Sequence, residues 1–463
     1  MKYLENSGMK KLRLLLILLV LNTFCTSAQN ADSVMIKRFF DNALQSDVSY
    51  NNLKELCEYA PGRLAGLPAM DSAMKYSLEL MKSMPFDTVY IQPCMVRQWL
   101  PGEDTSWYSP DGKAKFPLTV DVLGGSVATP ENGINAQVVI FNSIEEMKKA
   151  DPATVKGKIV YFNRPMNQTY YNTFRAYGEN ASMRVIGADE ASKMGAVAVL
   201  IRSLCTEIDD FPHTGIMRYK TSEVKIPGFA VSTKDALELD SALVVNPQMK
   251  IFLESTCKEL PEKEQGNVIG EIRGTVHPER IITVGGHLDS WYNSAGAHDD
   301  GGGCMQSLEV ARLFFETGYK PQNTLRVVFF IDEEMDQRGG KKYAAEAKAQ
   351  GEKHVFALES DHGMALPTGF SVDSAVLAKV LLWKDLLEPY GFKEIEKGYG
   401  GVDISFLKAL GVPLCGLVTD SQRYFEYHHS ANDTFDKIVR RELQLGAAGM
   451  ASLIYLVDKY GVE

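Results

Sequence analysis

Four short apolar runs constrain the fold of this chain more than any other feature of its sequence. They cover residues 281–284, 325–331, 355–358 and 412–418. Apolar runs of this length are typical of strands covered on both faces, as in a mostly parallel sheet between two layers of helices. A helical repeat at 304–317, closed by Gly318, lies between the first two runs. We therefore predict an α/β fold with a three-layer αβα architecture.

The rest of the chain divides into two kinds of segment. Residues 32–83 have a helical pattern with a break near 60–66, and 441–460 forms a closing helix. In the region between, short apolar runs alternate with helical segments and are typical of a small α/β domain. We predict a discontinuous main domain, residues 29–125 and 255–463, with a second domain inserted at 126–254.

Side chains that bind metals follow each of the four apolar runs. These are His287 and Asp289, then Glu333 and Glu334, then Asp361, and finally His428 and His429. In open α/β sheets, sites form beyond the carboxyl ends of the strands, where these loops would meet. Imidazole and carboxylate together suit zinc or a similar divalent ion. With Asp299 following the first run, the sequence predicts a metal site at this edge of the sheet.

The adjacent carboxylates Glu333 and Glu334 indicate how such a site would work. Two neighbouring carboxylates repel each other unless a cation neutralises them. One could bind a metal while the other takes a proton from a metal-bound water, whose pKa the metal lowers to about 7. Considered alone, the pair is explained equally well as a solvated acidic strand end.

Five segments together resemble the co-catalytic di-zinc exopeptidases, a family of aminopeptidases and glutamate carboxypeptidase-like enzymes. They read GGHLDSW, GAHDDGGG, the Glu-Glu pair, ESDHG and YHHSANDT. ESDHGMALPTG and HHSANDT are most similar to the carboxypeptidase Q branch of the family. This resemblance spans about residues 256–463 and implies the zinc-exopeptidase catalytic fold. Region 126–254, with VKGKIVYF and KMGAVAVLI, resembles the protease-associated (PA) domain inserted in many members.

The resemblance also implies two zinc ions per chain, or other divalent metals in their place. The implied metal ligands are His287, Asp299, Glu334, Asp361 and His429, with Asp299 bridging both ions. Glu333 would be the general base that activates a metal-bridged water and returns the proton to the leaving amine. Asp289 would hydrogen-bond the far nitrogen of His287 and orient its ring. The implied reaction is the hydrolysis of dipeptides or other short peptides.

Two of these ligand choices depend on the family pattern. His429, rather than His428, directly precedes Ser as the ligand does in the family, and His428 would then face the oxyanion. Asp300 is the alternative to Asp299 as the bridge, although the spacing after the preceding Gly-Ala favours Asp299. The chain departs from the family at 335–339, where MDQRG replaces the usual Gly-Leu-type turn. This departure affects the expected pocket wall rather than the metal site.

Two other functions fit the same fold. A glutaminyl cyclase-like transferase would use one zinc, and the complete second set of ligands argues against it. A catalytically inactive peptide-binding module would lack metal ligands, and none is missing.

Whether the enzyme removes residues from the amino or the carboxyl end of the peptide stays open, with Asp403 and Arg423 as candidates for binding a substrate terminus. The resemblance further suggests a homodimer.

The first 28 residues are typical of a secretory signal peptide. Basic residues at 10, 11 and 13 precede an apolar run at 14–21 and a small-residue cleavage site at 26–28. The run is short for a membrane span, although an uncleaved anchor and lipidation at Cys25 are alternatives. We expect an exported protein, periplasmic or secreted, with no membrane partner after the signal is removed.

The net charge of the chain argues against two classes of binding partner. The formal net charge is −10, and the first 28 residues contain four basic and one acidic residue, so the rest carries −13. An acidic body disfavours nucleic acid and anionic membranes as partners. A peptide substrate is the partner that we expect.

The remaining reactive residues are expected to have structural roles. Six cysteines follow the signal peptide without a CxxC pair, so a cysteine-based zinc site is not expected. The glycines at 301–303 lack the lysine of a phosphate-binding loop and predict close packing beside the metals. Five histidines are expected to be structural or solvent-facing: His213, His277, His298, His354 and His362.

Overall fold

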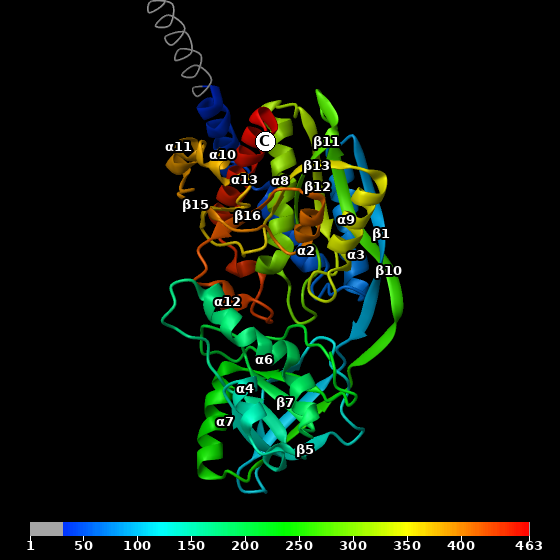
Figure 1. Ribbon diagram of the computed structural model, residues 1–463, viewed down its shortest axis with the longest axis vertical. Helices are drawn as coiled ribbons and strands as arrows, with labels where there is room; N and C mark the ends of the chain where they lie inside the picture. Colours follow the sequence, from blue (N-terminus) through cyan, green and yellow to red (C-terminus); the bar gives the residue numbers. More distant parts are fainter. Residues whose placement is uncertain (1–30, 463) are drawn as a thin grey trace, which may run out of the picture.

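The computed structural model describes residues 31–462 and contains two eight-stranded sheets (Figure 1). The first sheet has the order β1 (Thr88–Leu100), β10 (Lys258–Ile272), β12 (Asn323–Phe330), β11 (His277–His287), β13 (Lys353–Glu359), β16 (Leu414–Thr419), β14 (Pro367–Val372) and β15 (Glu394–Lys397). The four strands from β12 to β16 in this order are parallel, whereas β1, β10 and β14 pair antiparallel with their inner neighbours.

The first sheet is therefore mixed, and the predicted parallel pairing is found in its centre and between β14 and β15. β1 and β10 have many exposed or half-buried residues along their length, a pattern typical of antiparallel strands at a partly solvated edge. The four apolar runs found in the sequence correspond to the buried central strands.

Helices cover both faces of the first sheet, as the three-layer prediction requires. One face packs against residues 31–44, α2 (Val48–Tyr59), α3 (Pro68–Lys82), α8 (Gly302–Thr317) and α13 (Arg440–Tyr460), and the other against α9 (Arg338–Gln350) and η3 (Asp403–Leu410). Along β12, Val327 and Phe329 belong to the first core, and Val328 and Phe330 to the second. All four side chains are fully buried because the sheet is covered on both sides.

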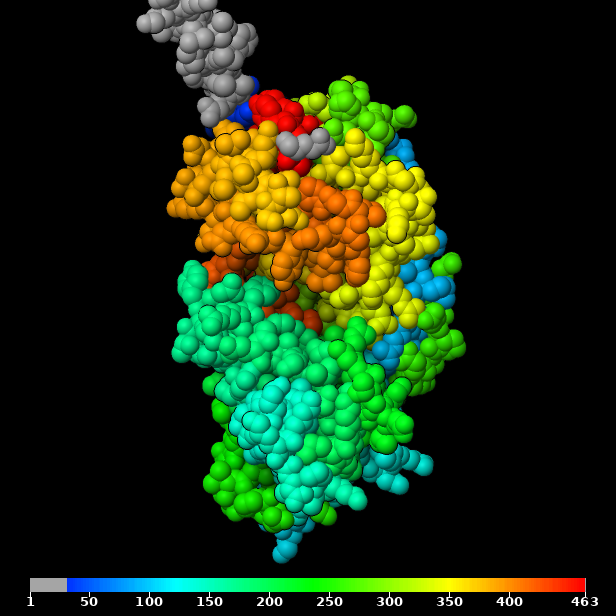
Figure 2. Space-filling view, in the orientation of Figure 1, coloured from blue at the N-terminus to red at the C-terminus, as the bar shows by residue number. Residues whose placement is uncertain are grey.

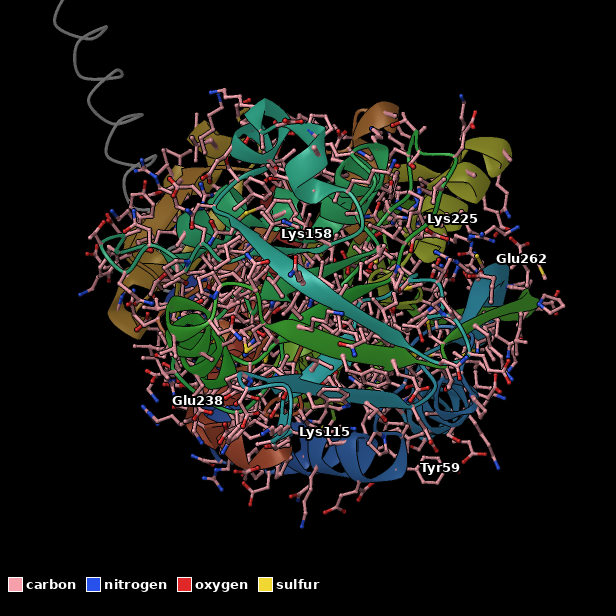
Figure 3. The ribbon with its side chains drawn as sticks, turned by 90° about the horizontal axis from the view of Figure 1, so that it is seen from below. Tyr59, Lys115, Lys158, Lys225, Glu238 and Glu262 are labelled. Atoms are coloured by element: carbon pink, nitrogen blue, oxygen red, sulfur yellow. The ribbon has the colours of Figure 1, made fainter. Side chains whose placement is uncertain are left out.

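The second sheet forms the other half of the molecule, at the bottom of Figure 1 and facing the viewer in Figure 3. Its order is β3 (Phe116–Pro117), β2 (Asp104–Ser109), β9 (Lys250–Ser255), β5 (Ile134–Phe141), β6 (Ile159–Phe162), β7 (Ala198–Arg202), β8 (Gly228–Val231) and β4 (Val120–Val122). One core contains α7 (Thr233–Val245), and the opposite core contains α4 (Ile144–Lys149), α5 (Pro152–Val155) and α6 (Thr173–Lys193).

The second sheet begins earlier in the chain than the insertion predicted at 126–254. β2 pairs antiparallel with β9 over six positions, from Asp104 opposite Ser255 to Ser109 opposite Lys250. Short strands with mixed polar and apolar residues have a weak periodicity, which explains why the sequence pattern did not reveal them. The sheet therefore spans residues 104–255, while the division into 29–125, 126–254 and 255–463 stays a prediction about domains.

The chain passes between the two halves at the long strands β1 and β10. These two strands pair along most of their length, and β10 begins three residues after β9 ends. Figure 2 shows a recess where residues of the second half, in green, meet the orange residues of the first half. No helix within residues 31–462 is long and apolar enough to cross a membrane. The predicted signal peptide, with Cys25, lies outside the described residues.

Replacing Gly449 with alanine is expected to lower the free energy of unfolding by about 1–3 kcal/mol, the usual cost of overpacking a core. Gly449 lies in α13, and a Cβ there would overlap the ring of the fully buried Phe392. Gly178→Ala in α6 is the matched control, because a Cβ there meets no atom and should raise helix stability by about 0.5–1 kcal/mol. Urea unfolding measures both, and equal effects would contradict the packing argument.

Candidate metal centre

The predicted site residues meet at one edge of the first sheet, in a cleft between the two halves. His287 ends β11, Glu333 and Glu334 follow β12, and Asp361 follows β13. His429 lies on the loop after β16, just beyond α12 (Tyr424–Tyr427). These residues and Asp299 all line the same cleft. Parallel central strands bring these loops together, because their carboxyl ends point to one edge.

The first group of donors consists of His287, Asp299 and Asp361. The Nε2 atom of His287 lies 3.1 Å from Oδ1 of Asp299 and 3.3 Å from Oδ1 of Asp361. One ligand atom from each residue lies within 4.8 Å of the others, which is close enough to hold one metal ion. The His287 ring is nearly inaccessible to solvent.

A second group lies on the other side of Asp299 and contains His429 and Glu334. The Nε2 atom of His429 is 3.5 Å from Oδ2 of Asp299 and 3.1 Å from Oε2 of Glu334. The indole N–H of Trp291 donates to the same Glu334 oxygen at 2.6 Å. Asp299 thus faces His287 with one carboxylate oxygen and His429 with the other, as a ligand shared by two ions would.

Asp300 has a different environment from Asp299. Its Oδ2 accepts the backbone N–H of His287 at 3.1 Å, and its Oδ1 accepts that of Gly303, also at 3.1 Å. Both oxygens are therefore engaged by the backbone. Asp299, in contrast, directs its carboxylate into the cleft, in line with the choice made from its spacing.

His428 and His429 stack on each other, with ring centroids 3.4 Å apart. His429 has a φ of 63°, a left-handed conformation that is uncommon for a residue with a Cβ. Its Nδ1 lies 3.3 Å from the carbonyl oxygen of Thr214, which leaves Nε2 to face Glu334. The Nε2 of His428 is 3.9 Å from Asp299, so His429 is the closer of the two to the acidic group.

Asp289 contacts His287 in another way than predicted. The Nδ1 of His287 donates to the backbone carbonyl of Asp289 at 2.9 Å, whereas the Asp289 carboxylate is 3.8 Å away. The carboxylate instead accepts the backbone N–H groups of Glu333 and Glu334 at 3.2 and 3.3 Å. The expected hydrogen bond from the imidazole N–H to the Asp289 carboxylate is therefore wrong, because two adjacent backbone donors occupy the carboxylate. Asp289 thereby links the histidine to the Glu-Glu pair.

The loop that carries Asp299 is held by two buried charged residues from distant parts of the chain. The Asp433 carboxylate accepts the backbone N–H groups of His298 and Asp299 at 2.7 and 3.1 Å. Arg63, with no exposed surface, donates to the carbonyl oxygens of Leu288 and Gly296. Sequence analysis assigned no role to either residue: Arg63 is far from the metal-binding motifs in the chain, and Asp433 lies within YHHSANDT but directly follows no apolar run.

The donor set fits divalent metal ions. Oδ2 of Asp299 and Oε1 of Glu334 are buried and have no hydrogen-bond partner among residues 31–462. Burial raises the pKa of Glu333 well above its usual range, and the neighbouring carboxylate of Asp361 adds to this rise while His287 opposes it. Carboxylates so crowded in a buried site need a cation to be stable in their ionised form.

The second half of the molecule supplies one wall of the cleft. Tyr177 and Arg184 of α6 and Arg218 of a nearby loop line the cleft. The guanidinium of Arg184 donates to the hydroxyl of Tyr177 at 2.6 Å, and that of Arg218 donates to Asp336 at 2.6 Å. Sequence analysis missed these residues because no periodicity indicates which helix of one half faces the other. Asp336 belongs to the MDQRG segment, where a changed pocket wall was expected.

Of the two residues proposed to bind a substrate terminus, neither lines the cleft. Arg423 pairs with Glu442 at 2.6 Å. Asp403 is fully buried behind the lining residues Gly401 and Val402, and its carboxylate oxygens have no hydrogen-bond partner in the described part of the chain. Arg184 and Arg218 do line the cleft, and their guanidinium groups also have protein partners, Tyr177 and Asp336.

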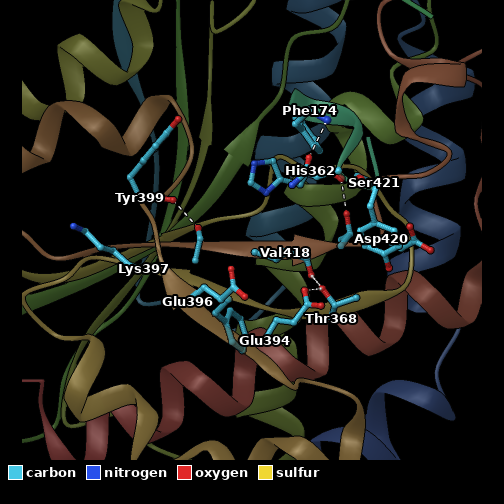
Figure 4. A pocket seen from close by; sticks show the side chains of 15 residues that line it. Phe174, His362, Thr368, Glu394, Glu396, Lys397, Tyr399, Val418, Asp420 and Ser421 are labelled. Atoms are coloured by element: carbon cyan, nitrogen blue, oxygen red, sulfur yellow. Dashed lines mark hydrogen bonds between the residues drawn. The ribbon is translucent and has the colours of Figure 1, made fainter. Parts of the chain in front are cut away.

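A second pocket adjoins the cleft and shares Phe174, His362 and Tyr399 with it (Figure 4). Its polar floor includes Glu394, whose carboxylate accepts the hydroxyl of Thr368 at 2.7 Å. Phe174 comes from α6, so this pocket also depends on the contact between the two halves. The cleft thus continues beyond the metal-binding residues.

Four other histidines named in the sequence analysis either contact protein groups or are exposed. His298 and His354 hydrogen-bond to neighbouring groups in the protein interior, His362 contacts the carbonyl of Leu417, and His277 is exposed. A Cβ at Gly302 or Gly303 would overlap Met364 or Ser360, which confirms close packing at the glycines. All six described cysteines are buried free thiols.

Comparisons with known proteins agree with this geometry. The model of peptidase family M28 matches residues 267–454. Carboxypeptidase Q from Bos taurus is 32% identical over 88% of this chain and 85% of its own. The structure of a peptidase M28 precursor from Shewanella amazonensis superposes with a TM-score of 0.87 at 32% identity, covering 93% of this chain and 97% of that one. A zinc aminopeptidase from Bacillus subtilis shares the fold, with a TM-score of 0.63 at 19% identity over 88% and 94% of the two chains.

Proposed function

This chain belongs to peptidase family M28 and is a zinc exopeptidase related to carboxypeptidase Q and the aminopeptidases, and we propose that it is an exported di-zinc enzyme that hydrolyses dipeptides or other short peptides. The observation that carries this proposal is the position of Asp299 between two groups of donors. A one-zinc transferase would not need the second group. The crowding of unpartnered carboxylate oxygens likewise favours two cations over one.

In this proposal, His287 and Asp361 would hold one zinc ion, His429 and Glu334 would hold the other, and Asp299 would serve both. Bound zinc supplies a Lewis acid that polarises the scissile carbonyl and acidifies a water molecule. The backbone carbonyl of Asp289 fixes a proton on Nδ1 of His287, so Nε2 presents its lone pair to the cleft. The Nδ1 atom of His429 lies 3.3 Å from both the Thr214 carbonyl oxygen and the Arg184 guanidinium, which together position its ring.

Glu333 is the proposed general base. It lines the cleft beside His287 and Asp361, and its backbone N–H is anchored by the Asp289 carboxylate. Its carboxylate would take a proton from the attacking water and hand it to the leaving amine, which balances the hydrolysis of the peptide bond.

The cleft supports a short substrate. Its volume of about 390 Å³ is at the small end of the range for small-molecule sites. Arg184 and Arg218 offer guanidinium groups on the wall formed by the second half, and a guanidinium pairs well with a carboxylate. A dipeptide has its free carboxylate within a few bonds of the scissile amide. These features favour dipeptides over internal segments of long chains.

Three further parts of the proposal extend beyond the cleft. The second sheet with α4, α6 and α7 is proposed to be a PA domain, which would make α6 a substrate-facing wall. Export to the periplasm or the exterior is proposed from the signal-like residues 1–28. A homodimer also stays a prediction.

The experiment that tests this function is a peptide panel assayed with the purified chain before and after chelation. Free dipeptides should be cleaved, blocking of both termini should abolish cleavage, and chelation should remove activity that zinc then restores. Metal analysis should find two zinc ions for the catalytic centre. Cyclisation of a peptide with an N-terminal Gln, or binding without turnover, would overturn the proposal in favour of the transferase or the inactive module.

A further inference from the structure

A loop in the second half of the molecule brings together a second set of metal-binding side chains. Cys205, Asp209 and His213 follow β7 at regular intervals of four residues. One ligand atom from each lies within 4.8 Å of the others, at the carboxyl edge of the parallel strands β5 to β8. None of the three lines the catalytic cleft.

The imidazole of His213 is oriented so that its Nε2 atom is available to bind a metal ion. The ring is almost completely buried, and its Nδ1 lies 2.6 Å from the carbonyl oxygen of His428. A carbonyl oxygen only accepts, so Nδ1 carries the proton and Nε2 has a lone pair. That Nε2 atom is buried without a hydrogen-bond partner within residues 31–462. Burial also lowers the pKa of His213 to about 4, so the ring is neutral, as a metal ligand must be.

Cys205 and Asp209 complete a donor set of suitable charge. The Sγ of Cys205 is 3.9 Å from Oδ2 of Asp209, and the thiol is 4% exposed. Burial raises the pKa of Cys205, and the charges of Asp209, Glu207 and Glu426 raise it further. A negative surrounding of this kind keeps a free thiol protonated and unreactive, but it attracts a cation.

We propose that Cys205, Asp209 and His213 form a separate metal site for zinc or a similar transition metal. Thiolate, carboxylate and neutral imidazole carry two negative charges, which a divalent ion neutralises in a largely buried position. Three protein donors leave the fourth position of a tetrahedral zinc for water. This assignment differs from the expectation in the sequence analysis. There, the absence of a CxxC pair argued against a cysteine-based zinc site, and His213 was expected to be structural or solvent-facing.

The site would connect the second sheet to the catalytic histidines. The Nδ1–H group of His213 donates a hydrogen bond to the carbonyl oxygen of His428. The backbone N–H of the adjacent Thr214 donates to the carbonyl oxygen of His429, and the Thr214 carbonyl oxygen contacts Nδ1 of His429. A metal on the Nε2 of His213 fixes the ring that makes the first of these contacts. The ion would therefore hold the loop at 203–216 against the segment that carries His428 and His429.

Cobalt(II) provides a selective probe for this site in the full-length protein. The proposed catalytic ligands are nitrogen and oxygen only, so a thiolate-to-cobalt charge-transfer band in the near ultraviolet reports a cysteine ligand alone. We expect the wild-type protein to show this band. Cys205→Ser should lose it completely, and Asp209→Asn should weaken cobalt binding. Both variants should retain the metals of the catalytic centre, so the two kinds of site can be distinguished.

Matched controls come from the same half of the molecule. Cys257→Ser replaces another buried thiol, and Asp210→Asn replaces an exposed neighbour of Asp209, so both variants should keep the band. X-ray absorption of the unmutated zinc protein gives an independent measurement, with a zinc–sulfur distance of about 2.3 Å expected. Absence of both the band and the zinc–sulfur distance would overturn the proposal, whatever the state of the catalytic centre.

Discussion

Replacing Glu333 with glutamine is expected to lower kcat on a dipeptide by about 10²–10⁴-fold, the usual contribution of a general acid-base residue. The amide has nearly the shape of the carboxylate but cannot accept the proton of the attacking water. The backbone N–H of residue 333 still donates to Asp289, so the loop should keep its position. Steady-state kinetics measures the change, and metal analysis should find the same zinc content as in the wild type.

Glu396→Gln is the matched control for this experiment. Glu396 is an exposed carboxylate of the adjoining pocket and does not line the metal cleft. Its replacement leaves the proton transfer untouched and should change kcat little. If Glu333→Gln retained full activity with full zinc content, the proposed role of Glu333 as base would be wrong, although the metal centre itself would stand.

Replacing Asp299 with asparagine is expected to remove activity to the level of the buffer blank and to lower the zinc content of the catalytic centre below one ion per chain. Asp299 faces both His287 and His429. Loss of an outer-shell partner costs about 10–100-fold in metal affinity, so loss of a shared charged ligand should cost more than about 100-fold for each ion. Mass spectrometry of the metals after dialysis measures the content, and thermal unfolding checks the fold.

Two comparisons make this result specific to Asp299. Asp436→Asn removes an exposed carboxylate on the loop after His429 and should leave zinc content unchanged. His287→Ala should release mainly one of the two ions, because His429 and Glu334 remain. A variant Asp299→Asn that still bound two ions in the catalytic centre would show that another carboxylate, with Asp300 the nearest candidate, joins the two metal positions.

Much of the site could be predicted because its donors lie directly after buried strands. A run of apolar residues has a local signature, and so does the change to His, Asp or Glu at its end. His287, Asp361 and the pairs Glu333–Glu334 and His428–His429 were found in this way, and the cleft contains all of them. The choice of Glu334, of His429 over His428 and of Asp299 over Asp300 needed the family pattern, since the members of each pair have the same chemistry and adjacent positions.

Other features depend on contacts that no local pattern records. The antiparallel edges of the first sheet arise from pairing between strands far apart in the chain, such as β1 with β10. The role of the Asp289 carboxylate depends on two backbone N–H groups more than 40 residues away. The sequence shows that residue 289 has a carboxylate, but not which backbone N–H groups lie beside it in the fold. The predicted hydrogen bond between this carboxylate and His287 was wrong for that reason.

The sequence by itself determined the class of fold and the chemistry of the donors, because apolar periodicity and residue type are properties of short segments. Only the tertiary structure decided which oxygen of Asp299 faces which histidine, and that α6 brings Arg184 to the cleft. It alone brought Cys205, Asp209 and His213 to within metal-binding distance. The physical reason is that these relations are set by packing and backbone hydrogen bonds between segments that are separate in the chain.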